Sequence, residues 1–225
     1  CNPIQYAEHR KTLENVICTA GKFGATHVST FAGAWEGKPV ESAYEEFGKV
    51  FRELADLAEE KGVKLGIENC LMDGTWEHAT CNIGFNPKAW EVMFEEVKND
   101  NFGLEWEPTH QMVQLIDPVT ELRKWCKKIV HIHGKDATID WDAVRHSGIS
   151  GAVPFVWHRM PGFGDTNWRD IISILRSNGY EDDICIEGYH DPVYSGELEM
   201  TGQLHALNYL KWCRGGDFTP TPWAK

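Results

Sequence analysis

The strongest constraint on how this chain can fold is a repeated pattern in which a short apolar run ends on glutamate or histidine. The pattern occurs in Leu65–Asn69, Leu104–His110, Ile129–Asp136 and Ile184–Gly188. Runs of this length are typical of buried strands, and parallel α/β sheets build their sites where several strands end. The sequence therefore predicts one shared site at the carboxyl edge of a parallel sheet.

Four residues at these strand ends are the candidate metal ligands, namely Glu68, Glu107, His133 and Glu187. Three carboxylates and one imidazole suit a single hard or borderline divalent ion, whereas structural zinc sites favour thiolates. We therefore expect one divalent metal, with Mn²⁺ preferred and Mg²⁺, Co²⁺ or Zn²⁺ as alternatives.

Two further polar residues, Glu105 and His131, lie two positions before candidate ligands. Residues two apart on a strand share a face, so Glu105 faces the same way as Glu107, and His131 the same way as His133. The residue nearer the strand end lies closer to the mouth of the site. We therefore expect Glu105 and His131 to lie deeper, as partners of the ligands or as polar groups of the core.

Strand and helix signals alternate along the chain, which is typical of βα units around a parallel sheet. Strands are expected over 26–33, 63–69, 102–107, 129–133 and 184–187. Helices are expected over 41–61, 86–99, 118–128, 168–178 and 197–213, with an irregular stretch over 137–167.

A closed (β/α)₈ barrel has eight strands. We therefore expect residues 1–214 to be a single domain holding the C-terminal five βα units of a TIM barrel, followed by an irregular tail over 215–225. The chain also begins without Met, and we expect the first strands to be lacking. An open, doubly wound sheet is the alternative.

Composition narrows the class of protein. The chain has 225 residues and a net charge of −12, which argues against nucleic acid and anionic membranes as partners because both require a basic surface. No apolar run reaches the roughly 20 residues of a membrane helix. The 7 cysteines form no CxxC pair, which favours reduced thiols and a cytoplasmic protein. A small, mostly neutral substrate is compatible with these features.

Three residues near the strand ends are candidates for substrate contact. His110 follows Glu107 by three residues and lands just above the strand end, where it could bind a substrate hydroxyl or orient a ligand. Arg159 lies in a loop over 157–165 that is long enough to cover a site. Trp106, like Trp35 and Trp157, could stack on a sugar. The alternatives are a surface histidine, a surface salt bridge and core packing.

The same segments, in this order, resemble the xylose-isomerase-like TIM barrels, in particular the sugar phosphate isomerase/epimerase group. The matching segments are Gly66–Asn69, Glu107–His110, Val130–Asp136, Pro161–Asp165 and Ile186–Gly188. With the elements around them, the resemblance covers the chain from about Asn2 to Leu210.

The resemblance implies strands five to eight of such a barrel, with Glu68, Glu107, His133 and Glu187 at the positions of the four metal ligands. It implies that His110 and Arg159 contact the substrate, and it is compatible with a homo-oligomer or a partner subunit. One departure matters, because the family usually has aspartate where this chain has Glu107. The extra methylene could change how this carboxylate binds the ion.

The reaction implied is proton removal beside the carbonyl of a keto sugar or polyol, phosphorylated or not, through an enediolate. Glu68 and Glu187 would exchange protons on opposite faces, with His110 beside them, giving an isomerase or epimerase. Loss of a β-substituent would instead give a lyase acting on 3-keto-glycosides or a dehydratase of the inosose type. A nuclease like the apurinic-site endonucleases and a non-catalytic sugar-binding module are the less favoured classes.

Overall fold

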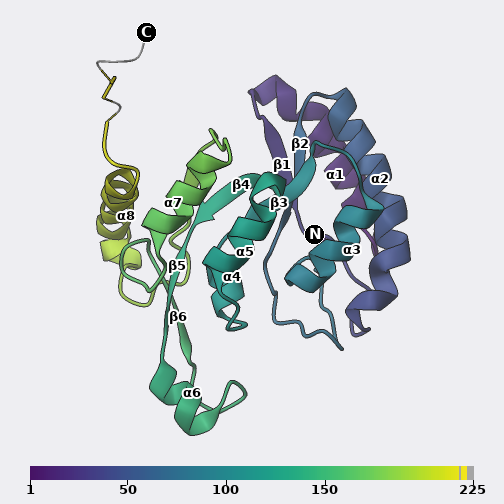
Figure 1. Ribbon diagram of the computed structural model, residues 1–225. Coiled ribbons are helices and arrows are strands. Elements are labelled where there is room, and N and C mark those ends of the chain that lie inside the picture. The colour runs from purple at the N-terminus through teal and green to yellow at the C-terminus, as the bar shows by residue number, and fades with distance from the viewer. Residues whose placement is uncertain (218, 222–225) are drawn as a thin grey trace. The chain divides into compact units, whose positions relative to one another are not determined.

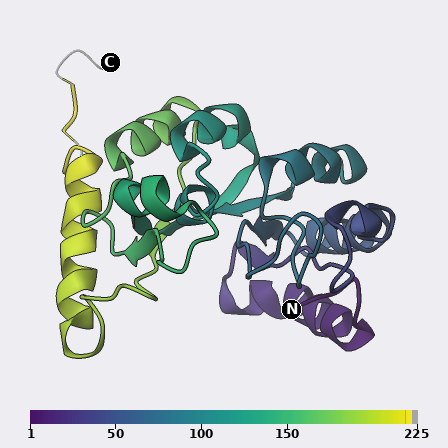
Figure 2. The same cartoon turned by 90° about the horizontal axis from the view of Figure 1, so that it is seen from below.

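The protein was studied as a computed structural model, which describes residues 1–217 and 219–221. The chain divides into two compact units, and each is described by itself. The first unit holds Cys1–His133 and Asp182–Cys185, and the second holds Gly134–Glu181 and the chain from Ile186 onward. Part of the predicted tail over 215–225 lies outside the described residues. Figure 1 and Figure 2 show the elements of both units in two views.

A five-stranded sheet carries the predicted strand ends. Its strands follow the order β1 (His27–Thr30), β2 (Lys64–Glu68), β3 (Phe102–Trp106), β4 (Ile129–Gly134) and β7 (Ile184–Ile186). The pairs β1–β2, β2–β3 and β3–β4 are parallel. Because these three pairs are parallel, the carboxyl ends of β1, β2, β3 and β4 form one continuous edge. All of the predicted strands are present.

Helices connect these strands in the first unit, and most begin where the sequence predicts. They are α1 (Ala7–Ala20), α2 (Tyr44–Glu60), α3 (Pro87–Glu96), α4 (Thr109–Met112) and α5 (Pro118–Trp125), with 3₁₀ turns at Gly21–Phe23, Val40–Ala43 and Cys126–Lys128. Asn86 and Asp117 cap α3 and α5, since their side chains accept from the backbone N–H of Lys88 and Thr120. Proline follows each cap, where its missing N–H costs nothing. The helix α1 was not predicted.

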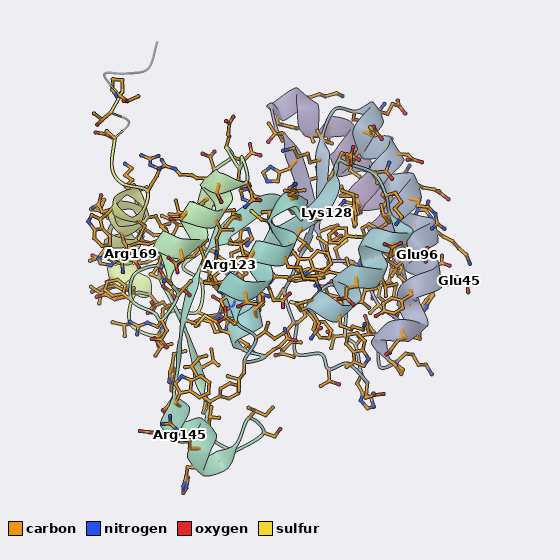
Figure 3. The ribbon with its side chains drawn as sticks, in the orientation of Figure 1. Glu45, Glu96, Arg123, Lys128, Arg145 and Arg169 are labelled. Carbon is orange, nitrogen blue, oxygen red and sulfur yellow. The ribbon has the colours of Figure 1, made fainter. Side chains whose placement is uncertain are left out.

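The core of the first unit lies between α2 and the sheet. Phe47 and Phe51, one helical turn apart, stack with ring centroids 4.6 Å apart, and both lie about 6 Å from the ring of Phe102 on β3. All three are buried, and each such ring contributes on the order of 2 kcal/mol to folding. By contrast, Figure 3 shows Glu45 among the side chains that project outward from α2. Helix α2 thus carries one apolar face, as its sequence pattern predicts.

The pairing of β3 with β4 contains a shift of one residue. Leu104 pairs with Ile129, but the next residue, Glu105, pairs with His131. A Cβ at Gly103 would lie 2.2 Å from the carbonyl oxygen of Lys128, so only glycine allows β4 to approach this closely. The shift is a β-bulge, and bulges re-aim side chains near functional sites. Here it places His131 on the same face of the sheet as Glu105.

The second unit corrects the prediction of an irregular stretch over 137–167. β5 (Asp136–Ile139) and β6 (Val156–Arg159) form an antiparallel ribbon that carries α6 (Trp141–Ser147) near its tip. The unit also holds α7 (Trp168–Ser177), a 3₁₀ turn at Gly196–Leu198 and α8 (Glu199–Cys213). Four-residue strands separated by a helix leave little periodicity in the sequence, which is why the ribbon was not foreseen.

Candidate active site

The imidazole of His133 lies among three carboxylates of the first unit. Its Nδ1 is 3.8 Å from Glu68 Oε1 and 4.0 Å from Glu107 Oε2. Its Nε2, on the other side of the ring, is 3.3 Å from Glu105 Oε1. Glu68 ends β2, Glu105 lies on β3, Glu107 follows β3 directly, and His133 is near the end of β4. Three of the predicted ligands therefore meet at the carboxyl edge of the sheet.

Buried asparagines hold the strand ends that present these carboxylates. The side chain of Asn69 donates to the carbonyl of Glu107 and accepts from its N–H, both at 2.9 Å. Asn82 donates to the carbonyls of Glu68 and Cys70, at 2.9 and 2.8 Å. An amide carries donor and acceptor together, so one side chain can satisfy both groups of an irregular backbone. The sequence contained a signal for Asn69, which directly follows Glu68, but we predicted no role for it.

His110 forms a close ion pair with Glu107. Its Nε2 lies 2.6 Å from Glu107 Oε1, and both side chains are buried. Burial alone would lower the pKa of His110, but the charge of Glu107 and the neighbouring Cys70 raise that pKa to about 10. One oxygen of Glu107 thus faces His110 and the other faces His133. The longer side chain at this position stays among the candidate ligands.

Like charges crowd this edge of the sheet. Burial, together with the charges of Glu105 and Glu107, raises the pKa of Glu68 to about 7, and His133 and His110 oppose part of that rise. Burial would also raise the pKa of Glu105, but the hydrogen bond and charge of His133 hold it below its usual range. Carboxylates brought together in this way are stabilised by a cation between them.

A pair of stacked histidines, His27 and His131, lies beside Glu105. The rings of His27 and His131 stack with centroids 4.2 Å apart and 22° between their planes. Ligand atoms of His27, Glu105 and His131 lie within 4.8 Å of one another, as do those of Glu68, Cys70 and His110. Burial, followed by the charge of His27, lowers the pKa of His131. Glu105 thus contacts the ring of His133 while belonging to a deeper polar cluster.

Two of the predicted site residues, Glu187 and Arg159, lie in the second unit. Glu187 follows β7, and its Oε1 is 2.7 Å from the Nζ of the buried Lys135. Arg159 lies on β6, where its Nε is 3.3 Å from Asp191 Oδ2. Because these residues belong to the other unit, their joining Glu68 and His133 stays a prediction. We did not single out Lys135, although it stands two positions after His133.

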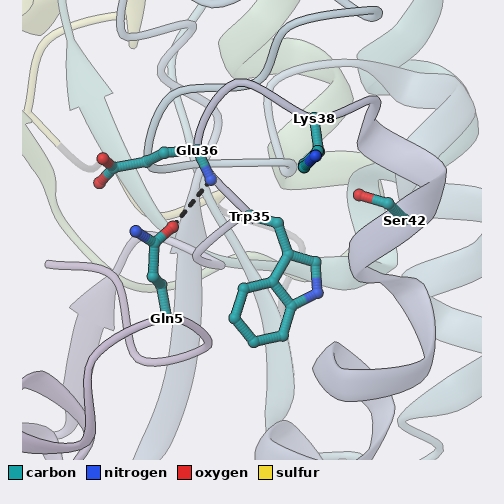
Figure 4. A pocket seen from close by; sticks show the side chains of 5 residues that line it. All are labelled: Gln5, Trp35, Glu36, Lys38 and Ser42. Atoms are coloured by element: carbon teal, nitrogen blue, oxygen red, sulfur yellow. Dashed lines mark hydrogen bonds between the residues drawn. The ribbon is translucent and has the colours of Figure 1, made fainter.

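The hollows on the first unit include two with different linings. One, of 330 Å³, is lined by Glu68 and Glu105 together with residues of α1 and β1. The other, of 520 Å³, is lined by Gln5, Trp35, Glu36, Lys38 and Ser42, and Figure 4 shows the Gln5 side chain accepting from the N–H of Glu36. Only the first hollow borders the cluster of carboxylates. It is therefore the better candidate for a substrate site.

Trp106 was a candidate for sugar stacking, and the structure gives it a packing role. Its side chain is fully buried, and its indole N–H donates to Gln111 Oε1 at 2.8 Å. Substrate contact by this ring stays a prediction.

Comparison with known proteins assigns the chain to a family. The family model described as xylose isomerase-like TIM barrel matches residues 2–211, and the chain belongs to that family. The fold is accordingly the α/β TIM-barrel type, here with five strands of the barrel sheet. The fold class and the family resemblance inferred from the sequence are confirmed.

Among curated relatives, the inosose dehydratase of Clostridium tetani is 26% identical over 182 residues, covering 79% of this chain and 57% of the relative. The rhizopine catabolism protein MocC of Rhizobium meliloti is 26% identical over 171 residues, covering 75% of this chain and 47% of that protein. The chain thus spans about half of the length of the curated relatives it matches.

Solved structures agree on the fold. The xylose isomerase domain protein from Planctomyces limnophilus has a TM-score of 0.69 at 20% identity, covering 92% of this chain and 65% of that one. The IolI protein, solved with a bound zinc atom, has a TM-score of 0.64 at 21% identity, covering 93% and 69%. At these identities the likeness concerns the fold.

The structure bears on two predictions made from composition, the lack of a membrane helix and the reduced state of the cysteines. Among the described residues, no helix is both long and apolar enough to cross a membrane. The seven cysteines all lie in the described part of the chain, and all are free thiols.

Proposed function

We propose that the protein is a divalent-metal-dependent enzyme that removes a proton beside the carbonyl of a polyhydroxylated ketone, and that it then expels water, as an inosose-type dehydratase would. The observation that carries this proposal is the position of His133 among Glu68, Glu105 and Glu107. Buried carboxylates gathered around one imidazole are characteristic of a metal centre or an acid–base site.

The donor set fits a divalent ion. Glu68, Glu107 and His133 would hold it from the first unit, and Glu187 would complete the set. Glu107 can do so through Oε2 because Oε1 is engaged by His110. When bound, such an ion polarises the substrate carbonyl and stabilises negative charge on its oxygen.

The chain's own residues would move the protons. Glu68 is proposed as the general base, because its carboxylate ends β2 beside His133 and borders the 330 Å³ hollow. His110 would keep Glu107 in place, and Lys135 would orient Glu187 through their 2.7 Å contact. Arg159, on β6, is proposed to bind a substrate oxygen, and the contact of its Nε with Asp191 Oδ2 at 3.3 Å would fix the orientation of its guanidinium.

Dehydration is favoured over epimerisation by the curated relatives named inosose dehydratase. An enediolate with a hydroxyl at the β-carbon can expel it as water once a proton is supplied. Epimerisation is the second candidate, because L-ribulose 3-epimerase shares the fold with a TM-score of 0.65. Cleavage of 3-keto-glycosides would begin with the same proton removal.

The deciding experiment combines metal content with solvent-deuterium exchange. The protein and a Glu107→Ala variant would be analysed by plasma mass spectrometry and then incubated in D₂O with Mn²⁺ and a panel of inososes, ketoses and 3-keto-glycosides. We expect one ion per chain, lost in the variant, and water loss from an inosose. Exchange without water loss would favour the epimerase. Absence of both metal and exchange would refute the proposal.

Two other classes are separated by simple controls. A nuclease would bind abasic DNA at physiological salt, which a net charge of −12 disfavours. A sugar-binding module would retain its ligand after the metal is removed by a chelator. An isotherm with and without chelator therefore distinguishes a binding protein from the proposed enzyme.

A further inference from the structure

We propose that Glu105 is a positioning residue that holds the imidazole of His133 with a proton on Nε2, so that Nδ1 is the nitrogen presented to the metal. The inference rests on the proposed metal function and deepens it. Glu105, which lies deeper than the ligands, would determine which ring nitrogen of His133 binds the metal.

The two ring nitrogens face different carboxylates. Glu105 Oε1 lies 3.3 Å from Nε2, whereas the Glu68 and Glu107 oxygens lie 3.8 and 4.0 Å from Nδ1. The bonding directions of the two imidazole nitrogens, Nδ1 and Nε2, lie in the ring plane and point away from each other. One ion bound at Nδ1 with Glu68 and Glu107 therefore cannot also take the Glu105 oxygen that faces Nε2.

A neutral imidazole carries its proton on one nitrogen and a lone pair on the other. A carboxylate accepts but does not donate, so a proton shared between Glu105 and His133 Nε2 leaves the lone pair on Nδ1. Histidines that bind metals commonly donate their second N–H to a carboxylate in this way, which orients the ring and strengthens the ligand. Glu105 is suited to this role by its place on the Nε2 side.

The backbone around Glu105 is well anchored. Its carbonyl accepts from the N–H of Asn69 at 3.2 Å, and its strand is paired on both sides. The bulge between β3 and β4 fixes which residue of β4 lies opposite Glu105, so that Glu105 pairs with His131 instead of Val130. Two positions after each of these partners, the chain reaches Glu107 and His133. Anchoring of this kind allows a buried side chain to hold another in one orientation.

A competing role for Glu105 would be a second metal site with His27 and His131. The rings of these histidines stack nearly face to face, with 22° between their planes. Lone pairs lie in the ring planes, so those of two stacked rings run in nearly parallel planes and do not converge on one ion. The stack therefore favours a polar packing cluster, and Glu105 retains its contact with His133.

The test compares Glu105→Met, which has no comparable acceptor, with Glu105→Gln, which keeps an acceptor oxygen. Glu95→Met, at an exposed glutamate of α3, is the matched control. Mn²⁺ binding would be followed by electron paramagnetic resonance of the free ion. The His133 ring would be followed in metal-free protein by ¹H–¹⁵N spectra of ¹⁵N-histidine samples, assigned with His133→Asn.

We expect Mn²⁺ to bind about 10- to 100-fold more weakly to Glu105→Met, with an intermediate loss in Glu105→Gln and none in the control. We also expect a hydrogen-bonded Nε2–H signal of His133 that disappears in Glu105→Met and is retained in part in Glu105→Gln.

Unchanged Mn²⁺ affinity together with an unchanged ring spectrum in Glu105→Met would overturn the inference. If that variant fails to fold, the same pair of results in Glu105→Gln would overturn it. Failure of the wild-type protein to bind Mn²⁺ would instead refute the proposed function, and the ring spectra of the metal-free proteins would still show whether Glu105 holds the His133 proton.

Discussion

The two units bury carboxylates in opposite ways. In the second unit, Asp136 accepts from the backbone N–H groups of Ala137, Thr166 and Gly162, at 2.8, 3.0 and 3.2 Å. Asp191 in the same unit accepts from those of Met160, Val193 and Tyr194, at 2.7, 2.8 and 2.9 Å. In the first unit, Glu68, Glu105 and Glu107 instead face the imidazole of His133.

The electrostatic result differs accordingly. Burial would raise the pKa of Asp191, but the backbone donors and Arg159 hold it below its usual range. Burial and neighbouring carboxylates raise the pKa of Glu68 to about 7. Asp191 is thus a stable anion that holds a loop, whereas burial outweighs the backbone donors at Asp136 and raises the pKa of that carboxyl. Glu68, which lies among other acids, is poised to take up a proton or a cation. Burial alone does not mark a functional carboxylate, and the partners distinguish the two cases.

The largest expected effect follows from changing a crowded carboxylate. Glu68→Gln should lower turnover about a thousand-fold and abolish the rise in melting temperature that Mn²⁺ produces, because the variant loses both a ligand and a base. Its metal-free form should be at least as stable as the wild type at pH 8, since one of the mutually repelling charges is gone. Thermal unfolding with and without Mn²⁺, beside activity, measures both effects. Glu60→Gln, an exposed change at the end of α2, is the control. Wild-type turnover in Glu68→Gln would contradict the role.

The next effect concerns a carboxylate held by backbone donors. Asp191→Ala should destabilise the protein by about 3 kcal/mol, because buried N–H groups lose their acceptor. Mn²⁺ should still bind with unchanged stoichiometry under conditions where the variant is folded. Urea unfolding and metal titration give the two readouts. A stable variant that has lost its metal would reverse the contrast between the units.

The smallest effect is a difference in pH dependence. Because the folded pKa of Glu68 is raised from 4.5 to about 7, the folded state binds this proton more tightly than the unfolded state. Its contribution is therefore most favourable below pH 4.5 and declines as the pH rises to 7. The lowered pKa of Asp191 acts in the opposite sense, stabilising the fold above its unfolded value and losing that contribution as the pH falls. Melting temperatures of metal-free wild type and Glu68→Gln between pH 5 and 8 should converge toward low pH. Parallel curves would exclude the raised pKa.

Much of the first unit could be predicted from its sequence. Its strands are apolar runs that end on polar residues, and the parallel arrangement brings Glu68, Glu107 and His133 to one edge. The roles of Asn69 and Asn82 could not be predicted, because both act on the backbone of other segments. The bulge at Glu105 was equally hidden, since the register depends on how two strands meet.

The second unit was less predictable for a related reason. Two of the three backbone partners of Asp136 lie 26 and 30 residues away, in a segment without helical or strand periodicity. Gly164 belongs to this arrangement, because a Cβ there would lie 2.3 Å from Asp136 Oδ1. Gly164 lies in one of the segments that resemble the family, but only the structure shows why a glycine is needed at this position.

Because of the one-residue shift between β3 and β4, the number of residues before His131 matters as much for the site as the identity of its side chains. In an unshifted pairing, Glu105 would lie opposite Val130, and His131 and His133 would fall on the face of Trp106. Removing or adding a single residue between Ile129 and His131 would therefore exchange the polar and apolar sides of β4 without altering any side chain of the site. Gly103 leaves room for the Lys128 carbonyl and so allows the shifted register in which β4 pairs with β3. Tolerance to substitution and tolerance to changes of length should thus diverge in this segment, and a family member that differs in length there would need a second, compensating change to keep its histidines in the site.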